Sequence, residues 1–250
     1  MASEPRQPRL AVLIDADNAS SRIATRLFEE IAKIGEASVR RIYGDFSGLR
    51  LKSWADVLST HAIKAEQNFA YTTGKNASDI ALVIDAMDLL HTGRFDAFCL
   101  ISSDSDFTGL ASRIREQGIE VYGFGEQKTP ESFRKACKRF IYTENLLPEI
   151  AVIAGQSNSG TPTAAAKLPP SAARPLIRKA VSQLDEEGVW VPLGRVGKRL
   201  LELASDFDPR TYGQTKLSDL VEKAGEFESS RTDTGHIQIR SKLAKKTIKS

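Results

Sequence analysis

The sequence predicts two domains: an N-terminal α/β domain with a doubly wound parallel sheet, and a small C-terminal winged helix-turn-helix domain. Over residues 1–150, short apolar runs alternate with amphipathic stretches of helical length, which is typical of a parallel sheet with helices on both faces. Residues 151–173 are rich in Ala, Gly, Ser, Thr and Pro and contain no acidic or aromatic residue, so we expect a flexible linker. Beyond this linker, three short helical patterns are followed by two strand-like stretches.

The N-terminal domain opens with a continuous apolar run over 10–14, as expected for a strand that is covered on both faces. A helix follows to about residue 33, with Ser20 or Ser21 as its cap. A later helix is expected to begin with Ser78 as its cap. Further strands are predicted over 37–43, 62–65, 95–101 and 119–124, and further helices over 51–58, 79–90 and 106–117.

The same patterns set the domain boundaries: 1–150 for the N-terminal domain, 151–173 for the linker, 174–241 for the winged-helix domain and 242–250 for a basic tail. The winged-helix domain is expected to contain helices over 175–187, 194–203 and 216–224. A short extended stretch is expected over 189–193. Residues 227–228 and 236–240 are predicted to pair as a hairpin.

Charge is divided unevenly along the chain. Residues 1–150 hold 19 Lys and Arg against 21 Asp and Glu, a net of −2, whereas residues 151–250 hold 16 against 11, a net of +5. This division indicates different tasks for the two parts, although chance produces similar differences in small domains. A basic C-terminal part is consistent with a nucleic-acid partner.

Composition excludes several classes of protein. The two cysteines, Cys99 and Cys137, are too few for a disulfide scaffold, which favours a reduced, cytoplasmic environment. The apolar runs are far shorter than the roughly 18 residues of a membrane-spanning helix, so no membrane association is expected. The three histidines have no cysteine nearby and support neither a zinc site nor a Ser-His-Asp triad.

Carboxylates follow the predicted strands at the points where these strands end. Asp15 comes directly after the first strand, and Asp104 and Asp106 follow the fourth. Asp79 lies in the first turn of a helix that starts from the same edge, because right-handed crossovers bring the carboxyl ends of parallel strands together. Converging carboxylates repel one another unless a cation is present, and Mg²⁺ or Mn²⁺ prefers such oxygen ligands. The four aspartates therefore predict a metal site that activates water for attack on a phosphate.

A purely structural interpretation stays open at this stage. Aspartate is common at strand ends and helix starts as a cap or through the helix dipole, and Asp106 could simply cap the helix that it precedes. Asp85 lies six residues beyond Asp79, roughly 240° around the helix at about 100° per residue. We therefore expect Asp85 in a buried pair or behind the metal ligands rather than on the ion.

Other residues are candidates for contact with a phosphodiester substrate. Lys75 lies in a turn just before Asp79, although the spacing of a P-loop is absent. Tyr43 begins a Gly-rich segment and could stack on an unpaired base, and Ser103 directly precedes Asp104. On the predicted helices of the C-terminal domain, four cations are candidates for phosphate contacts: Arg195, Lys198, Arg199 and Lys216.

Four segments resemble the NYN domain, a branch of the PIN-like ribonuclease superfamily that is grouped with bacterial proteins once called domain of unknown function 88. They are VLIDADNAS, YGDFSG, TTGKNASDIALVIDAMDLL and FCLISSDSDFTGLASRIREQGIEVYGFGE. The resemblance spans roughly residues 9–145 and implies a PIN-like sheet and a ribonuclease that depends on Mg²⁺ or Mn²⁺. By motif position, it implies a site made of Asp15, Asn18, Asp79, Asp104 and Asp106.

The segment YGQTKLSDLVEKAGEFE resembles the OST-HTH domain, also called LOTUS, over about residues 172–241. This resemblance implies RNA binding or the docking of a protein partner. Trp190 is expected to lie in the core of this domain.

The sequence thus predicts a metal-dependent ribonuclease whose C-terminal domain recruits RNA. A second hypothesis is a non-catalytic RNA-binding or adaptor protein with a vestigial acidic pocket. A phosphatase of the haloacid dehalogenase type is disfavoured, because its motif requires Thr or Val where Ala19 stands. A receiver domain is disfavoured because its phosphoacceptor context is missing. Homodimer formation is left open.

Overall fold

The computed structural model describes residues 6–68, 76–147, 167–184, 190–232 and 234–242. The chain divides into two compact units, residues 1–164 and residues 165–250, and each unit is described by itself. Most of the predicted linker, over 151–166, and most of the predicted basic tail, over 243–250, lie outside the described residues. No described helix is both long and apolar enough to cross a membrane.

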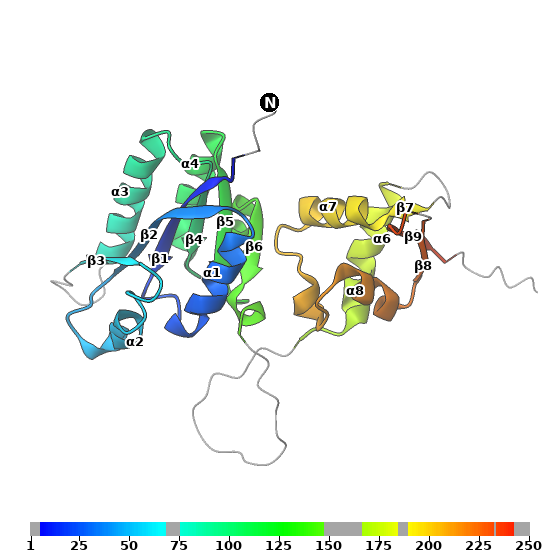
Figure 1. The fold of residues 1–250 in the computed structure, drawn as a ribbon, viewed down its shortest axis with the longest axis horizontal. Helices are drawn as coiled ribbons and strands as arrows, with labels where there is room; N and C mark the ends of the chain where they lie inside the picture. Colours follow the sequence, from blue (N-terminus) through cyan, green and yellow to red (C-terminus); the bar gives the residue numbers. More distant parts are fainter. Residues whose placement is uncertain (1–5, 69–75, 148–166, 185–189, 233, 243–250) are drawn as a thin grey trace, which may run out of the picture. The chain divides into compact units, whose positions relative to one another are not determined.

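Within the described part of the N-terminal unit, six parallel strands form one sheet in the order β3-β2-β1-β4-β5-β6 (Figure 1). The strands are β1 (Arg9–Asp15), β2 (Glu36–Gly44), β3 (Lys64–Gln67), β4 (Ala97–Ile101), β5 (Glu120–Gly125) and β6 (Arg139–Tyr142). The predicted doubly wound α/β fold is confirmed. The strand β6 was not predicted from the sequence.

Helices cover both faces of this sheet. On one face, the core includes side chains of α1 (Ala24–Ala32) and α2 (Lys52–Ala55). On the other face, it includes side chains of α3 (Ala77–His91), α4 (Thr108–Glu116) and α5 (Glu131–Ala136). Short 3-10 turns accompany them: η1 (Ser21–Ile23), η2 (Leu49–Leu51), η3 (Ser105–Phe107) and η4 (Thr143–Asn145).

The two predicted serine caps have different outcomes. The side chain of Ser20 caps η1 by accepting a hydrogen bond from the backbone N–H of Arg22, as expected. The prediction for Ser78 is wrong, because α3 already begins at Ala77, with Asn76 in the N-cap position. Alanine has the highest helix propensity, and once its backbone is helical the following serine lies inside the first turn.

Alternate residues of β1 enter two separate hydrophobic cores, one on each face of the sheet. Leu10, Val12 and Ile14 belong to the core that includes α1. Ala11 and Leu13 belong to the core that includes α3 and α4. All five side chains are fully buried, which explains why this strand is a continuous apolar run rather than an alternating one.

In the described part of the C-terminal unit, short helices pack on a three-stranded antiparallel sheet of order β7-β9-β8. The elements are η5 (Pro170–Ala173), α6 (Arg174–Ser182), β7 (Val191–Pro192), α7 (Leu193–Leu203), η6 (Pro209–Tyr212), α8 (Leu217–Ala224), β8 (Phe227–Arg231) and β9 (Ile237–Ser241). The pairing of β8 with β9 confirms the predicted hairpin and extends it. Helices followed by an antiparallel hairpin give the predicted small winged-helix domain.

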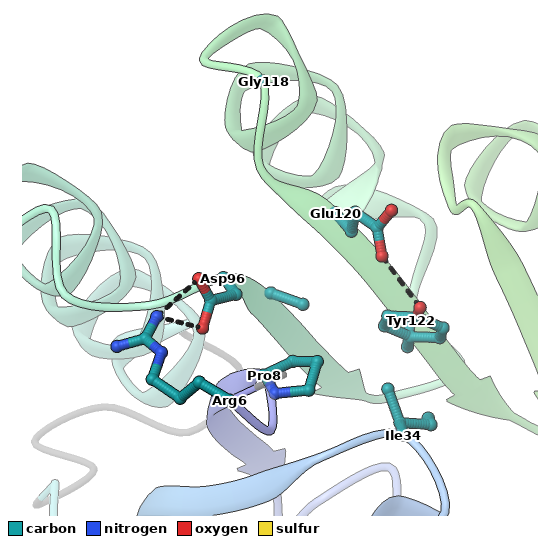
Figure 2. Close-up of a pocket in the computed structure, with 8 residues that line it drawn as sticks. Arg6, Pro8, Ile34, Asp96, Gly118, Glu120 and Tyr122 are labelled. Carbon is teal, nitrogen blue, oxygen red and sulfur yellow. Dashed lines mark hydrogen bonds and ion pairs between the residues drawn. The ribbon is translucent and has the colours of Figure 1, made fainter. Parts of the chain in front are cut away.

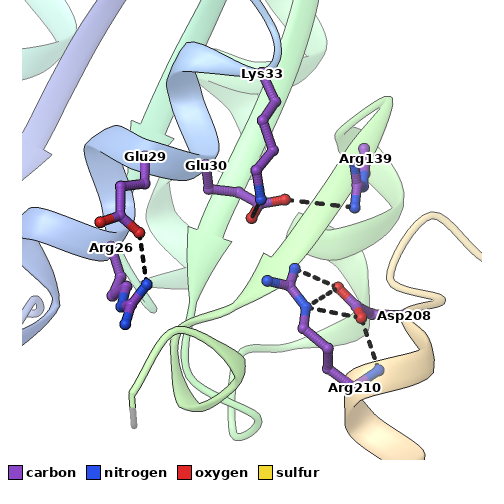
Figure 3. A network of polar contacts seen from close by, with 7 residues as sticks. All are labelled: Arg26, Glu29, Glu30, Lys33, Arg139, Asp208 and Arg210. Atoms are coloured by element: carbon purple, nitrogen blue, oxygen red, sulfur yellow. Dashed lines mark hydrogen bonds and ion pairs between the residues drawn. The ribbon is translucent and has the colours of Figure 1, made fainter. Parts of the chain in front are cut away.

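Paired carboxylates stabilise each unit separately, and Figure 3 shows one network in each. In the N-terminal unit, Glu30 on α1 is buried and pairs with Lys33 at 2.9 Å and with Arg139 at 3.8 Å. In the C-terminal unit, the buried Asp208 caps η6 by accepting the backbone N–H of Arg210 at 2.8 Å, and also pairs with the Arg210 guanidinium. These networks stabilise the two folds, and they do not include residues of the predicted site.

Candidate active site

The strand order reverses its direction between β1 and β4. From β1 the chain continues outwards to β2 and β3, and from β4 it continues in the opposite direction to β5 and β6 (Figure 1). The loops that leave the carboxyl ends of β1 and β4 therefore diverge, and sheets of this kind bind their ligands at such a point. Asp15 is the last residue of β1, and Ser102 directly follows β4. The first two predicted acidic motifs thus begin side by side.

Asp15 is almost completely buried and accepts four hydrogen bonds. Its Oδ1 accepts the backbone N–H groups of Asp17 and Asn18 at 3.0 and 3.3 Å. Its Oδ2 accepts the Asn18 side-chain amide at 2.8 Å and the Ser102 hydroxyl at 2.7 Å. Burial raises the pKa of Asp15, and these hydrogen bonds limit the rise. Asp15 and Asn18, which the sequence predicts to act together, are therefore in direct contact.

The loop after β4 is organised by its serines and by Asp104. Ser102 Oγ accepts the backbone N–H of Asp104 at 3.0 Å, so one hydroxyl joins Asp104 to Asp15. Asp104 is the N-cap of η3 and accepts the backbone N–H of Asp106 at 2.9 Å. Asp106 is therefore not the capping residue, and its carboxylate is exposed. Ser103 Oγ accepts the backbone N–H of Glu126 at 2.8 Å, which ties this loop to the end of β5.

Replacing Ser102 by alanine is expected to destabilise the protein by about 1–3 kcal/mol, because the buried Asp15 carboxylate loses one of its four donors and the Asp104 N–H loses its acceptor. The side chain is 2% exposed, so water does not readily replace the hydroxyl. Urea unfolding of Ser102→Ala at neutral pH measures this effect. Ser105→Ala, on an exposed residue of the same loop, serves as the control. Equal midpoints for the two variants would contradict the prediction.

Asp79, in the first turn of α3, lies within the electrostatic influence of the other acidic residues. Burial raises the pKa of Asp79 to about 6, and repulsion from Asp15 and Asp104 adds to the rise. Asp17 and Asp106 contribute smaller repulsions of the same sign. The structure thus brings an aspartate from α3 near the acidic loops after β1 and β4.

The donor chemistry of this site fits a hard divalent cation, although the side chains do not form a closed cage. In the described part of the chain, no three His, Cys, Asp or Glu side chains are grouped tightly enough to hold a metal ion as they stand. The roughly four lone-pair sites of Asp15 are all occupied by its four donors. Mg²⁺ is often bound by only one or two carboxylates, with waters completing its coordination. The repulsion at Asp79 is the charge imbalance that such an ion would relieve.

Comparison with known families identifies both units. The model of the NYN domain matches residues 9–147, which is more than half of the chain. This chain belongs to the NYN domain family. NYN domains are PIN-like nucleases. The model of the OST-HTH/LOTUS domain matches residues 166–239, and domains of that family bind RNA. The resemblances predicted from the sequence motifs are confirmed.

Two solved structures are similar to parts of this NYN protein. A protein of unknown function from Vibrio parahaemolyticus is 17% identical, and the alignment covers 56% of this chain and 95% of that chain with a TM-score of 0.47. An uncharacterized protein from Nitrosomonas europaea is 34% identical, and the alignment covers 37% of this chain and 94% of that chain with a TM-score of 0.27. No curated protein gives a significant match.

The position of Tyr43 in the NYN domain contradicts its predicted role in base stacking. Its side chain is 1% exposed and belongs to the core that includes α3 and α4. Its hydroxyl donates to Asp85, which also pairs with Arg41. A ring in this position has no free face for a base. Asp85 is thus in an ion pair, as predicted, but this pair is only partly buried. Lys75 lies outside the described residues.

Two residues beside the acidic loops of the NYN domain were missed by the sequence analysis. Ser102 bridges Asp15 and Asp104, and its only sequence signal is its place at the end of an apolar strand. Arg50, in η2, pairs with Asp17 and brings a largely exposed cation to the rim of the acidic edge. Arg50 follows the Gly-rich segment that begins at Tyr43, but nothing in that spacing identifies Asp17 as its partner.

A cavity of about 400 Å³ lies at the opposite end of the NYN sheet (Figure 2). Its lining includes Pro8, Ala97 and Glu120, which lie at the amino ends of β1, β4 and β5. The charged groups there have partners, because Arg6 pairs with Asp96 and Tyr122 donates to Glu120. This cavity is therefore separate from the acidic edge.

The four predicted cations of the OST-HTH/LOTUS domain lie on or beside two helices. Arg195 and Lys198 are exposed on α7, and Lys216 is exposed in the N-cap position of α8. Arg199, also on α7, donates to Gln183 and pairs with Glu202 at 2.7 Å. Three of the four candidates therefore offer exposed positive charge from the helices of this domain.

Proposed function

We propose that this protein is a hydrolase that cleaves RNA phosphodiester bonds with the help of Mg²⁺ or Mn²⁺, and that its C-terminal domain holds the RNA. One observation carries the proposal. Asp79 is repelled by the negative charges of Asp15, Asp104 and Asp106, which lie after the carboxyl ends of β1 and β4 in an NYN domain. Carboxylates that repel one another at a ligand-binding edge are typical of a cation site.

Each acidic residue receives a role in this proposal. Asp79 and Asp104 would hold the ion together with Asp15, which would exchange one of its present hydrogen bonds for the ion. Asp106 would complete the surroundings of the ion or orient the attacking water. The bound ion polarises the scissile phosphate and lowers the pKa of a bound water. The hydrogen bonds from Asn18 and Ser102 favour the ionised form of Asp15 and hold its carboxylate in place.

The substrate contacts complete the proposal. Asn18 and Lys75 would position the phosphate beside the acidic edge. Ser103 would act through the loop that it ties to β5 rather than through a direct contact. In the C-terminal domain, phosphates would meet the cations on α7 and before α8. Four further points stay predictions: the domain limits proposed from the sequence, a homodimer, a protein partner and a cytoplasmic location.

Cleavage of labelled RNA tests the proposed function directly. The full chain is incubated with structured and unstructured RNAs in the presence of Mg²⁺, Mn²⁺ or EDTA. We expect cleavage of unstructured RNA with at least one of the two metals and none with EDTA. RNA binding without turnover in either metal would contradict the nuclease assignment.

The alternative function is that of a non-catalytic RNA-binding or adaptor protein. The observation that favours it is the absence of a ready cluster of three ligands among the described residues, together with the fully bonded Asp15. Under this alternative, the acidic edge is a structural remnant, and neither metal supports turnover.

Neutralising two helix cations is expected to weaken RNA binding and its dependence on salt. In the double variant Arg195→Gln, Lys198→Gln, two phosphate contacts are lost, and the slope of log K against log salt falls by about 1.4, at roughly 0.7 per contact for a single strand. Fluorescence anisotropy with a labelled oligonucleotide in EDTA measures both quantities. Lys179→Gln, which removes one cation from α6, is the control. An unchanged slope in the double variant would exclude these two side chains as phosphate contacts.

A further inference from the structure

The hairpin sheet of the C-terminal unit has one face in the core and one face outside it. Val191, Ile239 and Phe227 point to the core side, and all three are buried. Successive side chains of a strand lie on opposite faces of a sheet, so the neighbours of these three residues along the strands lie on the outer face. This outer face consists of Trp190, Pro192, Glu228, Ser230, Gln238 and Arg240, and we call it the wing face.

Three side chains form a row across the wing face. Glu228 is paired with Arg240 in the strand register, and Trp190 lies on the other side of Arg240, next to the pair Val191–Ile239. The Arg240 guanidinium lies 4.6 Å from the centre of the Trp190 ring. Glu228 Oε2 accepts from both Nε and an amino group of Arg240 at 2.7 Å. The expectation that Trp190 belongs to the core is wrong: this residue directly precedes β7, its ring lies under Arg240 and it is only half-buried.

This row fixes the plane of the Arg240 guanidinium. The guanidinium carbon lies over the Trp190 ring and the Nε edge is bound to Glu228, yet the Arg240 side chain remains 41% exposed. A ligand can therefore still reach the guanidinium. A guanidinium that is already oriented loses little conformational entropy when a ligand stacks on it, and its flat faces are weakly hydrated.

We propose that the wing face takes an unpaired RNA base, which stacks on the free side of the Arg240 guanidinium and extends the Trp190–Arg240 stack. This inference rests on the RNA binding that is part of the proposed function. Protein modules that recognise single-stranded RNA stack its bases on aromatic rings and on arginine planes. The net charge of +5 over residues 151–250 complements the phosphates on either side of such a base.

The position of the wing face relative to α7 supports an RNA strand rather than an isolated nucleotide. α7 begins at Leu193, directly after the last residue of β7, so Arg195 follows Pro192 by three positions. Exposed cations of α7 are therefore close to the wing face along the protein chain. They could contact the phosphates of an RNA strand that has one base stacked on Arg240. Stacking and phosphate contact would then be separate contributions, with different dependence on salt.

The variant Arg240→Lys separates stacking from charge. Lysine keeps the positive charge but has no flat group to stack on a base or on Trp190. We expect the affinity of the full chain for a labelled oligouridine, measured by anisotropy in EDTA, to fall about tenfold. Because no charge is lost, the same factor is expected at low and at physiological salt.

Arg178→Lys is the matched control. Arg178 also pairs with a glutamate, Glu226, at 2.7 Å, but no ring lies under it in the described contacts. The control is expected to bind oligouridine as the wild type does. Equal affinities for Arg240→Lys and Arg178→Lys would overturn the proposal, and the wing face would then be left for a protein partner.

Tryptophan fluorescence of the wild-type protein reports on the same site. The chain has two tryptophans, and Trp54 is 1% exposed in the N-terminal core, so RNA can contact the ring of Trp190 but not that of Trp54. Oligouridine is expected to quench the emission, and Trp190→Phe is expected to abolish the quenching while keeping most of the affinity. Saturation with RNA and no change in emission would overturn the proposal. RNA cleavage by the wild type, measured separately, shows whether the nuclease assignment stands in that case.

Discussion

The variant Asp104→Asn is expected to cleave RNA at least about a hundredfold more slowly than the wild type. A carboxylate that holds a divalent ion contributes to a stabilisation of several kcal/mol at the reacting phosphate, and each tenfold in rate corresponds to about 1.4 kcal/mol. The fold should be unaffected, because asparagine is as good an N-cap as aspartate and can still accept the backbone N–H of Asp106. Initial rates with Mn²⁺ and a thermal unfolding curve measure the two effects.

Asp88→Asn is the matched control for this variant. It makes the same chemical change on the exposed side of α3, nine residues from Asp79 and on the opposite side of the helix. The control should cleave RNA at the wild-type rate. Full activity in Asp104→Asn would show that Asp104 is only a capping residue, and the proposed metal site would have to be abandoned.

The variant Asp79→Asn is expected to lose RNA cleavage to a similar extent and yet to be more stable than the wild type in EDTA at pH 8. The pKa of Asp79 is about 6 in the folded protein, above its ordinary value of 3.8. The folded state therefore binds this proton more tightly than the unfolded state does. Its contribution to stability is complete below about pH 4 and is lost as the pH rises through 6.

The expected gain for Asp79→Asn at pH 8 is about 1 kcal/mol, because the charge that the folded state repels is absent. This figure is smaller than the pKa displacement alone would give, since solvent screens a half-buried group. Urea unfolding of variant and wild type at pH 8 and pH 4.5 measures it, and the gain should shrink at the lower pH. Added Mg²⁺ should stabilise the wild type more than the variant. A variant that is less stable at pH 8 would show that Asp79 makes a structural bond instead.

Together the two variants distinguish the nuclease from the adaptor hypothesis. If the acidic edge binds a catalytic ion, both variants lose activity, while neither is damaged in its fold. If the edge is a remnant, Asp79→Asn still relieves repulsion and gains stability, but there is no turnover to lose. The stability of Asp79→Asn therefore tests the geometry, and the rate of Asp104→Asn tests the function.

Local patterns predicted most of the fold because burial on both faces of a parallel sheet leaves a direct trace in the sequence. The apolar run of β1 and that of β4 are examples, and the acidic residues that follow them mark the carboxyl edge. The strand order left no such trace. It depends on which strands pair across long separations, as β1 does with β4, more than eighty residues later.

The sequence by itself determined that two domains of different charge exist, that the first is a parallel α/β sheet, and that carboxylates end its strands. Only the tertiary structure decided what each side chain does there. The burial of Asp15 is tolerated because Ser102, which follows another strand, supplies a donor that compensates for the lost water. Tyr43 is removed from the solvent because alternation along a strand has two outcomes, and only packing decides which face meets the core. Trp190 lies outside the core because its ring packs against Arg240 instead.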